Sequence, residues 1–173
     1  VSSDIERGVG QVLKGATDFP TNMALGATFN PHYSKLQGII TAIEARSVGI
    51  HIAYAPVADV NINPDNPIIN IRSYGEDSHW VSQFVENYIT ALQENKAIAT
   101  AKHFPGHGDT SEDSHSHLPI LDISRKRFAS AWSVSTAITL PACSSSGTVS
   151  IPVPGPISST VSSCVICAAS TIR

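Results

Sequence analysis

Short apolar runs alternate with longer amphipathic segments along the first two thirds of the chain, and this alternation restricts the fold more than any other feature. The apolar runs have the length of buried strands, and residues that break regular structure separate them from the amphipathic segments. Strands that alternate with amphipathic helices are typical of parallel βαβ units. We therefore expect an α/β fold with strands at residues 1–3, 50–56 and 97–101.

Two helices are expected between these strands, from Pro31 to about Gly49 and from about Asp77 to Asn95. Asn30 is suited to cap the first helix and Ser78 the second. Each helix has apolar residues at helical spacing, which we expect to be buried. In the first helix these are Tyr33, Leu36, Ile39, Ile40 and Ile43, and in the second Trp80, Val81, Phe84, Val85, Tyr88, Ile89 and Leu92.

The polar residues best suited to chemistry follow the predicted strands, as they do in a (β/α)8 barrel. A complete barrel needs about 250 residues, whereas only three strands can be recognised here. We therefore expect a partial (β/α)8 TIM barrel over residues 1–128, truncated at both ends, and an irregular tail over residues 129–173. Missing strands would expose apolar faces and lower solubility. Because Val1 is neither an initiator methionine nor the start of a signal peptide, we expect the chain to begin inside a larger protein, with no compartment assigned.

One loop concentrates the residues that can carry chemistry. It runs from Lys102 to Pro119, directly after the third apolar run, and it contains four histidines, three acidic residues, two glycines and a lysine. Gly106 and Gly108 allow a sharp turn or a positive φ. A buried strand that leads into such a loop is typical of a site at the carboxyl end of a parallel sheet. The alternative is a solvated loop whose histidines cap turns.

Asp113 and His115 have the spacing of a proton-transfer pair within this loop. Side chains at i and i+2 of an extended segment point to the same side. A carboxylate that accepts a hydrogen bond from one ring nitrogen fixes the tautomer, so that the other nitrogen can exchange a proton near neutral pH. Lys102 and His103, at the strand end, could donate hydrogen bonds to the hydroxyl groups of a polar ligand.

A metal site is the main alternative for the histidines of this loop. Their imidazoles are all possible ligands, but their spacings match no common ligand template. The histidines concerned are His103, His107, His115 and His117.

The loop sequence K-H-F-P-G-H-G-D-T-x-x-D-S-H-x-x-L-P resembles the signature of glycoside hydrolase family 3, in its β-N-acetylglucosaminidase (β-hexosaminidase) branch. The resemblance covers roughly residues 1–122. It implies a retaining exo-glycosidase that acts on terminal β-linked N-acetylglucosamine. Four other segments support it in the expected order, at residues 4–8, 19–28, 54–61 and 72–77.

The resemblance also implies roles for individual residues. By motif position, His115 is the acid/base and Asp113 its orienting partner. The carbohydrate substrate is the implied partner, and no metal or organic cofactor is required. The residues that would hold its hydroxyl and acetamido groups are Asp4, Arg72, Lys102 and His103.

Arg72 lies at the end of a loop, residues 57–74, that is too long for a simple connector and that we expect to serve a site. Its guanidinium is a rigid fork that can hold two ligand oxygens. The alternative for Arg72 is an ion pair with Glu76 or Asp77. Glu6, which follows the first predicted strand, is interpreted as structural only.

The nucleophile is missing from this assignment. The family places it as an aspartate after a later strand, but no Asp or Glu follows Asp122 in this chain. We therefore expect the intact parent enzyme to cleave the sugar and the 173-residue chain not to do so. The alternatives are a β-glucosidase or a phosphorylase of the same family, a non-catalytic sugar-binding remnant, and a histidine-rich metallohydrolase.

The tail differs in composition from the rest of the chain. From Ala129 onward the only charged residue is Arg173, and all three cysteines lie there, at positions 143, 164 and 167. A single C-x-x-C is weak evidence for a redox or zinc site, and we interpret the cysteines as incidental. The tail is either a frame-shifted sequence that begins near residue 125 or a Ser/Pro-rich linker.

Composition argues against two classes of partner. The net charge is −3 and only 14% of residues are charged, so the chain has no basic stripe for nucleic acid. No apolar run approaches the length of a membrane span. These features fit one ordinary globular domain.

Overall fold

The computed structural model describes residues 1–104 and 106–116. The predictions for His117 and for the tail at residues 129–173 lie outside the described residues. Within them, no helix combines the length and the apolar composition that a bilayer span would require.

In the part of the chain that the structure describes, three short parallel strands form the sheet, in the order β1 (Ser2–Ser3), β2 (Ile52–Ala53) and β3 (Ile98–Ala99). The register places Ser3 opposite Ala53 and Ala53 opposite Ala99. A bridge between Val57 and Lys102 continues the pairing beyond β2 and β3. The parallel βαβ arrangement is confirmed, and its strands are shorter than the apolar runs.

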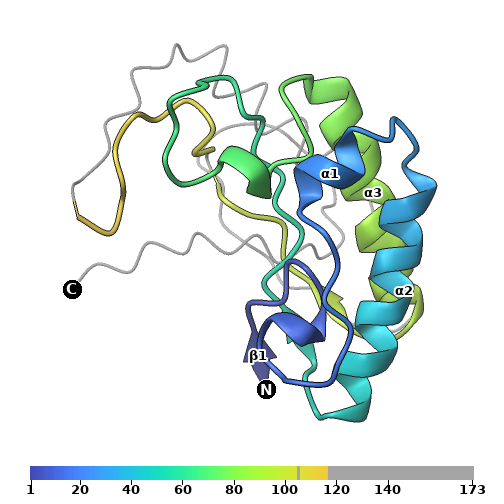
Figure 1. The fold of residues 1–173 in the computed structure, drawn as a ribbon. Coiled ribbons are helices and arrows are strands. Elements are labelled where there is room, and N and C mark those ends of the chain that lie inside the picture. The colour runs from blue at the N-terminus through green and yellow to red at the C-terminus, as the bar shows by residue number, and fades with distance from the viewer. Residues whose placement is uncertain (105, 117–173) are drawn as a thin grey trace, which may run out of the picture.

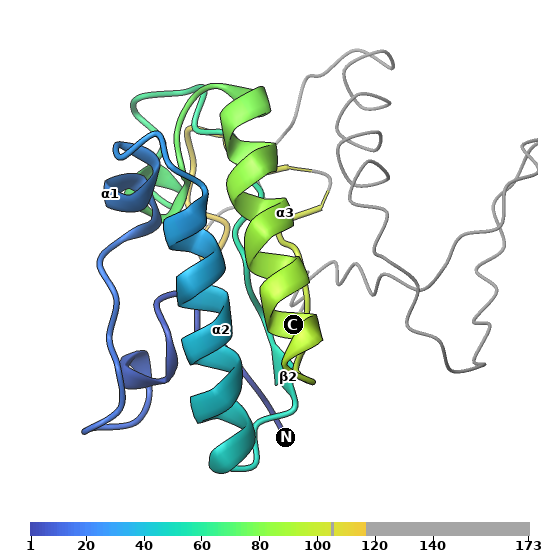
Figure 2. The ribbon, with the colours of Figure 1, turned by 90° about the vertical axis from the view of Figure 1, so that its right-hand side faces the viewer.

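Two long helices lie side by side on one face of the sheet (Figures 1 and 2). α2 (His32–Ser47) connects β1 to β2, and α3 (Ser78–Glu94) connects β2 to β3. Both match the predicted helices to within a residue or two, which is the usual uncertainty of helix ends. The connecting segments contain three short helices: η1 (Val9–Gln11), α1 (Asn22–Gly26) and η2 (Asn70–Arg72).

Side-chain hydrogen bonds mark the starts of both helices, and a glycine follows the end of α2. The Asn30 Oδ1 atom accepts a hydrogen bond from the amide of His32 at 3.1 Å, and Gly49 follows α2 with φ 81°. Asp77 caps α3, because its carboxylate accepts from the amides of His79 and Trp80 at 2.8 and 3.0 Å. The expectation that Ser78 would cap α3 is therefore wrong.

The buried face of α3 is the predicted one and supplies much of the core. Trp80 is only partly buried, and its ring packs edge-on against Phe29 with centroids 5.7 Å apart. Tyr74 stacks on Phe84 at 5.1 Å, which joins α3 to the loop before it. The side chains of α3 that are at most 1% exposed are Val81, Phe84, Val85, Tyr88, Ile89, Ala91 and Leu92.

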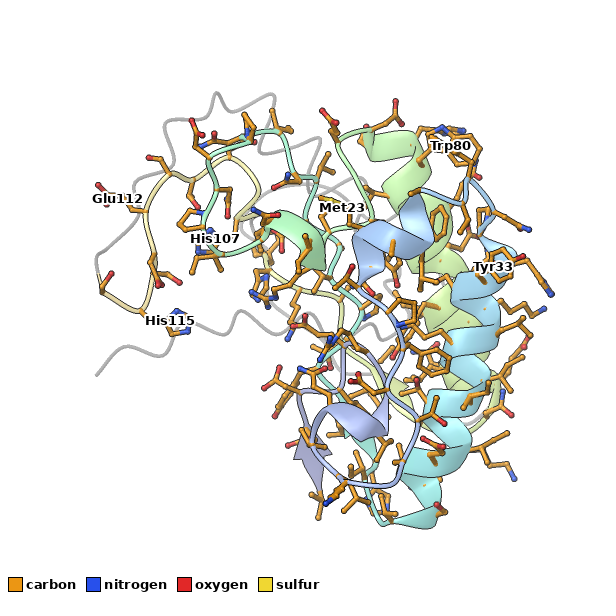
Figure 3. The ribbon with its side chains drawn as sticks, viewed as in Figure 1. Met23, Tyr33, Trp80, His107, Glu112 and His115 are labelled. Carbon is orange, nitrogen blue, oxygen red and sulfur yellow. The ribbon has the colours of Figure 1, made fainter. Side chains whose placement is uncertain are left out.

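The buried face of α2 is not the predicted one. Tyr33, Leu36, Ile40 and Ile43 are between 37% and 57% exposed, and Figure 3 shows Tyr33 on the outer side of the helix. The face that packs inward is made of small and polar residues instead. These are Ser34, Gln37, Gly38, Thr41, Ala42 and Ala45.

The close approach of α3 explains this inversion. A Cβ atom at Gly38 would lie 2.7 Å from the backbone oxygen of Tyr88, so the two helices leave no room for large side chains between them. Ser34 Oγ donates a hydrogen bond to the Phe84 carbonyl at 2.7 Å, and Gln37 Nε2 donates to the Glu6 carbonyl at 3.0 Å. Small side chains permit the contact, and these hydrogen bonds pair two of its buried donors, Ser34 Oγ and Gln37 Nε2.

β3 is less buried than its apolar sequence suggests. Ala97, Ala99 and Thr100 are buried, but Ile98 is 46% exposed. Within the described residues, β3 is an edge strand of the sheet, so one side of it has no neighbour. The prediction of a fully buried strand at residues 97–101 is wrong at this position.

Candidate active site

Charged side chains and one imidazole, from four segments, meet beyond the carboxyl ends of the strands. Two follow β1, one follows β2, one ends η2, and two follow β3. This is the edge of a parallel sheet at which α/β proteins build their sites. We call this group the charged cluster, and its members are Asp4, Glu6, Asp59, Arg72, Lys102 and His103.

Glu6 lies at the centre of the charged cluster. Arg72 donates to its carboxylate twice, from Nε at 3.0 Å and from Nη2 at 2.8 Å, and Lys102 Nζ lies 2.6 Å from Oε1. Burial would raise the pKa of Glu6, but the hydrogen bonds from Arg72 and the charge of Lys102 outweigh it and lower the pKa to about 2. Glu6 therefore stays ionised and holds both cations in place.

This geometry changes the interpretation of two residues. The hydrogen bond to Glu6 is the largest cause that raises the pKa of Arg72 above its ordinary value. The alternative ion pair of Arg72 with Glu76 or Asp77 is not the one that forms, because Glu6 takes that place. Glu6 in turn is a member of the cluster rather than a structural residue apart from it.

Asp4 is a solvent-exposed carboxylate that pairs with the buried ammonium of Lys102. Lys102 Nζ donates to Asp4 Oδ1 at 2.6 Å, while the lysine side chain is 7% exposed and the aspartate side chain 63%. The ammonium is therefore held by two carboxylates. Asp4 is the most accessible member of the cluster, which suits it to contact a ligand.

Asp59 holds His103 from the opposite side. Its Oδ2 atom accepts from the His103 amide at 3.0 Å and lies 2.6 Å from His103 Nδ1. Its side chain is completely buried, whereas that of His103 is 23% exposed. The other ring nitrogen, Nε2, lies 3.4 Å from Arg72 Nη2. Four of the cluster's residues were predicted as sugar-binding from the sequence, and the structure brings all four together.

Sequence reasoning missed Asp59 and the central position of Glu6. Both lie a few residues beyond a predicted strand, where side chains of a parallel sheet converge. That signal could have identified both residues. Neither spacing nor residue type, however, shows that a buried carboxylate pairs with residues more than 40 positions away.

The long loop at residues 57–74 packs against the loop that follows β3. Asn66 Nδ2 donates to the His107 carbonyl at 2.6 Å, and Asn63 Nδ2 donates to the Thr110 carbonyl at 3.2 Å. A Cβ atom at Gly108 would lie 1.7 Å from the backbone oxygen of Val60, so only glycine permits this contact. The two loops are therefore held together by side-chain and backbone contacts.

Asp113 and His115 form the expected pair. The Asp113 Oδ1 atom accepts from the His115 amide at 2.8 Å and lies 2.7 Å from His115 Nδ1. The backbone hydrogen bond from His115, followed by the side-chain one, lowers the pKa of Asp113. Ser116 Oγ donates to the Asp113 carbonyl, so the bonds of the pair lie within its own loop.

The structure does not bring this pair to the charged cluster. The side chains of His115 and Asp113 are 81% and 44% exposed. Figure 3 shows His115 and Glu112 at the outer end of the loop, well separated from His107. Pairing of the two residues is thus observed, whereas a shared pocket with Arg72 and Lys102 is not.

His107 lies between these two groups of residues. Its amide donates to Asp59 Oδ1 at 2.6 Å, its Nδ1 atom pairs with Thr110 Oγ1, and its ring meets that of His103 edge-on at 6.2 Å. Among residues 1–104 and 106–116, no group of three or more His, Cys, Asp or Glu side chains is arranged to hold a metal ion.

Comparison with known proteins identifies the family. Residues 1–135 match the Glycosyl hydrolase family 3 N terminal domain. The chain belongs to glycosyl hydrolase family 3. This confirms the family resemblance found in the sequence of the loop after β3.

Three similar proteins are each longer than this chain. Beta-hexosaminidase A from Pseudoalteromonas piscicida is 39% identical over 115 residues, which is 65% of this chain and 19% of that protein. The family 3 beta-N-acetylglucosaminidase from Paenibacillus sp. str. FPU-7 has a TM-score of 0.73 and 38% identity, covering 79% of this chain and 27% of that one. The beta-glucoside phosphorylase BglX has a TM-score of 0.75 and 26% identity, covering 80% and 25%.

The chain therefore spans between 19% and 27% of the length of these three relatives. Its fold is TIM-barrel-like, with a small parallel sheet and helices on one face. Within the family, the charged cluster lies where the barrel places its sites, at the carboxyl ends of the strands.

Proposed function

We propose that this chain is the sugar-binding and acid/base part of a retaining family 3 glycosidase that removes terminal β-linked N-acetylglucosamine. The observation that carries the proposal is the charged cluster. It combines accessible hydrogen-bond donors and acceptors at the carboxyl ends of three parallel strands. The names of two relatives, a beta-hexosaminidase and a beta-N-acetylglucosaminidase, support the choice of sugar.

Asp4, Arg72, Lys102 and His103 would bind the sugar. Each sugar hydroxyl can donate one hydrogen bond and accept others, so a site that mixes a carboxylate with cations can satisfy it completely. Glu6 holds Arg72 and Lys102 at fixed positions through contacts of 2.6–3.0 Å. Binding therefore costs little side-chain ordering, which favours affinity.

His115 would be the acid/base and Asp113 its orienting partner. The contact of 2.7 Å between His115 Nδ1 and Asp113 supports this role, because it leaves Nε2 to exchange a proton. The role requires His115 to approach a sugar bound at the charged cluster. The nucleophile, an aspartate that follows a later strand in the family, would come from outside this chain, since no Asp or Glu follows Asp122.

The first experiment measures binding and turnover by the 173-residue chain. Calorimetry with N-acetylglucosamine should show binding that Arg72→Ala abolishes, and an aryl N-acetyl-β-glucosaminide should not be hydrolysed. Robust turnover by the purified chain would show that the nucleophile is present after all. Arg46→Ala, on the exposed end of α2, is the matched control and should bind normally.

The second experiment tests catalysis in a complete protein. The matching segment of the Pseudoalteromonas piscicida relative is replaced by residues 1–116 of this chain, and hydrolysis of the aryl glycoside is measured. His115→Ala should lower the rate about 100-fold or more, the usual contribution of a general acid/base. A chimera that folds and binds the sugar but hydrolyses it equally well with and without His115 would refute the assignment.

A second candidate reaction is phosphorolysis of β-glucosides. The likeness to BglX, with a TM-score of 0.75, favours it. The same chimera distinguishes the two reactions, because a phosphorylase needs inorganic phosphate and releases a sugar phosphate. Preference for an aryl β-glucoside and a rate that depends on phosphate would support this candidate over the hydrolase.

A further inference from the structure

We propose that Asp59 is a positioning residue that fixes His103 as the neutral Nδ1–H tautomer, so that Nε2 accepts a hydrogen bond from the ligand instead of donating one. The sequence suggested the opposite polarity, with His103 as a donor to a sugar hydroxyl. The tautomer follows from protein contacts alone. Its consequence for sugar recognition rests on the proposed function.

The first edge of the ring is fixed by a fully buried carboxylate. Asp59 Oδ2 lies 2.6 Å from His103 Nδ1 and accepts from the His103 amide at 3.0 Å. A carboxylate can only accept, so Nδ1 must carry a proton. The other oxygen, Oδ1, accepts from the His107 amide at 2.6 Å. With both oxygens bonded, Asp59 has no freedom to turn away from the ring.

The backbone of Asp59 is also held in place. Ser73 Oγ donates to the Asp59 carbonyl at 2.6 Å, and Ser73 is itself completely buried. Ser73 directly follows Arg72, so one short segment positions both the guanidinium and the carboxylate that face the two edges of the imidazole. This arrangement fixes the orientation of the ring, and not only its protonation.

The second edge of the ring faces a group that can only donate. His103 Nε2 lies 3.4 Å from Arg72 Nη2, and a guanidinium has no acceptor. A proton on Nε2 would point at an N–H group of Arg72, whereas a lone pair on Nε2 can accept a hydrogen bond from that N–H group. Asp59 on one side and Arg72 on the other therefore select the same tautomer. Nε2 has one lone pair, so a ligand hydroxyl that reaches it would take the place of this long Arg72 contact and would act as the donor.

Nuclear magnetic resonance of the 15N-labelled 173-residue chain tests the tautomer directly. In the neutral ring, His103 Nδ1 should give the shift of a protonated nitrogen and Nε2 that of an unprotonated one. The signals are assigned by their loss in His103→Gln. A protonated Nε2 in the unaltered chain would overturn the proposal, whatever the variants do.

Asp59→Asn tests the cause of the tautomer. An amide NH2 in place of Oδ2 would donate to Nδ1, so the Nε2–H form should gain population and the two nitrogen shifts should move toward each other. Asp65→Asn, at an exposed position in the same loop, is the matched control and should leave both shifts unchanged. An unchanged tautomer in a folded Asp59→Asn chain would show that Asp59 is not the positioning residue.

Deoxyfluoro sugars test the consequence for recognition, because fluorine replaces a hydroxyl without being able to donate. N-acetylglucosamine analogues fluorinated at each ring hydroxyl in turn are compared by calorimetry. One analogue should bind about tenfold more weakly, the usual worth of a hydrogen bond to a fixed partner, and this loss should vanish in His103→Ala. If every loss persists in His103→Ala, the acceptor role is wrong. If the sugar itself does not bind, the proposed function fails while the tautomer measurement still decides the role of Asp59.

Discussion

The carboxylate of Glu6 and the guanidinium of Arg72 form a two-point hydrogen bond at 2.8 and 3.0 Å, although 66 residues separate them in the sequence. Lys102 approaches the same carboxylate at 2.6 Å. One buried anion thus connects the segments that follow β1, η2 and β3. The arrangement of the charged cluster depends on it more than on any other residue.

Glu6→Gln should therefore destabilise the fold. The change leaves Arg72 and Lys102 without their shared buried counter-ion, which costs toward the lower end of about 3–5 kcal/mol because Lys102 keeps its ion pair with Asp4. Asp18→Asn is the control, because its ion pair with Arg7 is longer, at 3.6 Å, and exposed. That pair should contribute less than about 1 kcal/mol. Chemical denaturation measures both, and equal losses would show that the cluster does not hold the segments together.

The same carboxylate predicts a pH dependence of stability. The pKa of Glu6 is lowered from 4.5 to about 2 in the folded chain. The stabilisation is fully present above pH 4.5 and is lost as the pH falls toward 2, because the unfolded chain takes up the proton first. Denaturation curves of the unaltered chain and of Glu6→Gln should therefore converge in acid. A constant difference in unfolding free energy down to pH 2 would contradict this assignment.

The lowered pKa of Asp113 should depend mainly on a backbone hydrogen bond. The largest cause of the lowered pKa of Asp113 is the hydrogen bond from the His115 amide, which His115→Ala retains. The titration of Asp113, followed by the 13C shift of its carboxyl group, should therefore stay below the ordinary range in that variant. A return to the ordinary value would mean that the imidazole, and not the backbone, controls this carboxylate.

Gly38→Ala should separate α2 from α3. The added Cβ atom would lie 2.7 Å from the backbone oxygen of Tyr88 and 3.0 Å from Ala91 Cβ. Overpacking of this kind costs about 1–3 kcal/mol, which exceeds the gain of up to about 1 kcal/mol in helix propensity. Ser47→Ala, at the exposed end of the same helix, should change the unfolding free energy by less than about 0.5 kcal/mol. A stabilised Gly38→Ala chain would show that the helices do not approach this closely.

The outer face of α2 should tolerate charge. Tyr33 and Ile43 are 47% and 57% exposed, so Tyr33→Lys combined with Ile43→Glu should leave the melting temperature nearly unchanged and reduce self-association in light scattering. Ala42→Lys, at a position with no exposed surface, should unfold the chain. If the double variant unfolds as Ala42→Lys does, the apolar outer face of α2, made of Tyr33, Leu36, Ile40 and Ile43, is covered in solution.

The apolar outer face of α2 also shows where sequence reasoning failed. Periodicity identified the helix and its bounds, since apolar spacing depends on the local geometry of the backbone. It assigned the wrong face, because the inward face is chosen by the room that α3 leaves next to Gly38. In α3 the most apolar face is also the buried one, so the same reasoning succeeded there.

The sequence by itself determined the βαβ order, the two long helices, the family and four of the six residues that gather at the strand ends, because each depends on local spacing or on a contiguous motif. Only the tertiary structure decided that Glu6 joins Arg72 to Lys102, that Asp59 contacts His103, and that the pair of Asp113 and His115 lies apart from the charged cluster. These contacts join residues that are distant in the chain. Their partners are selected by burial and by the requirement that every buried charge be paired, which no local pattern encodes.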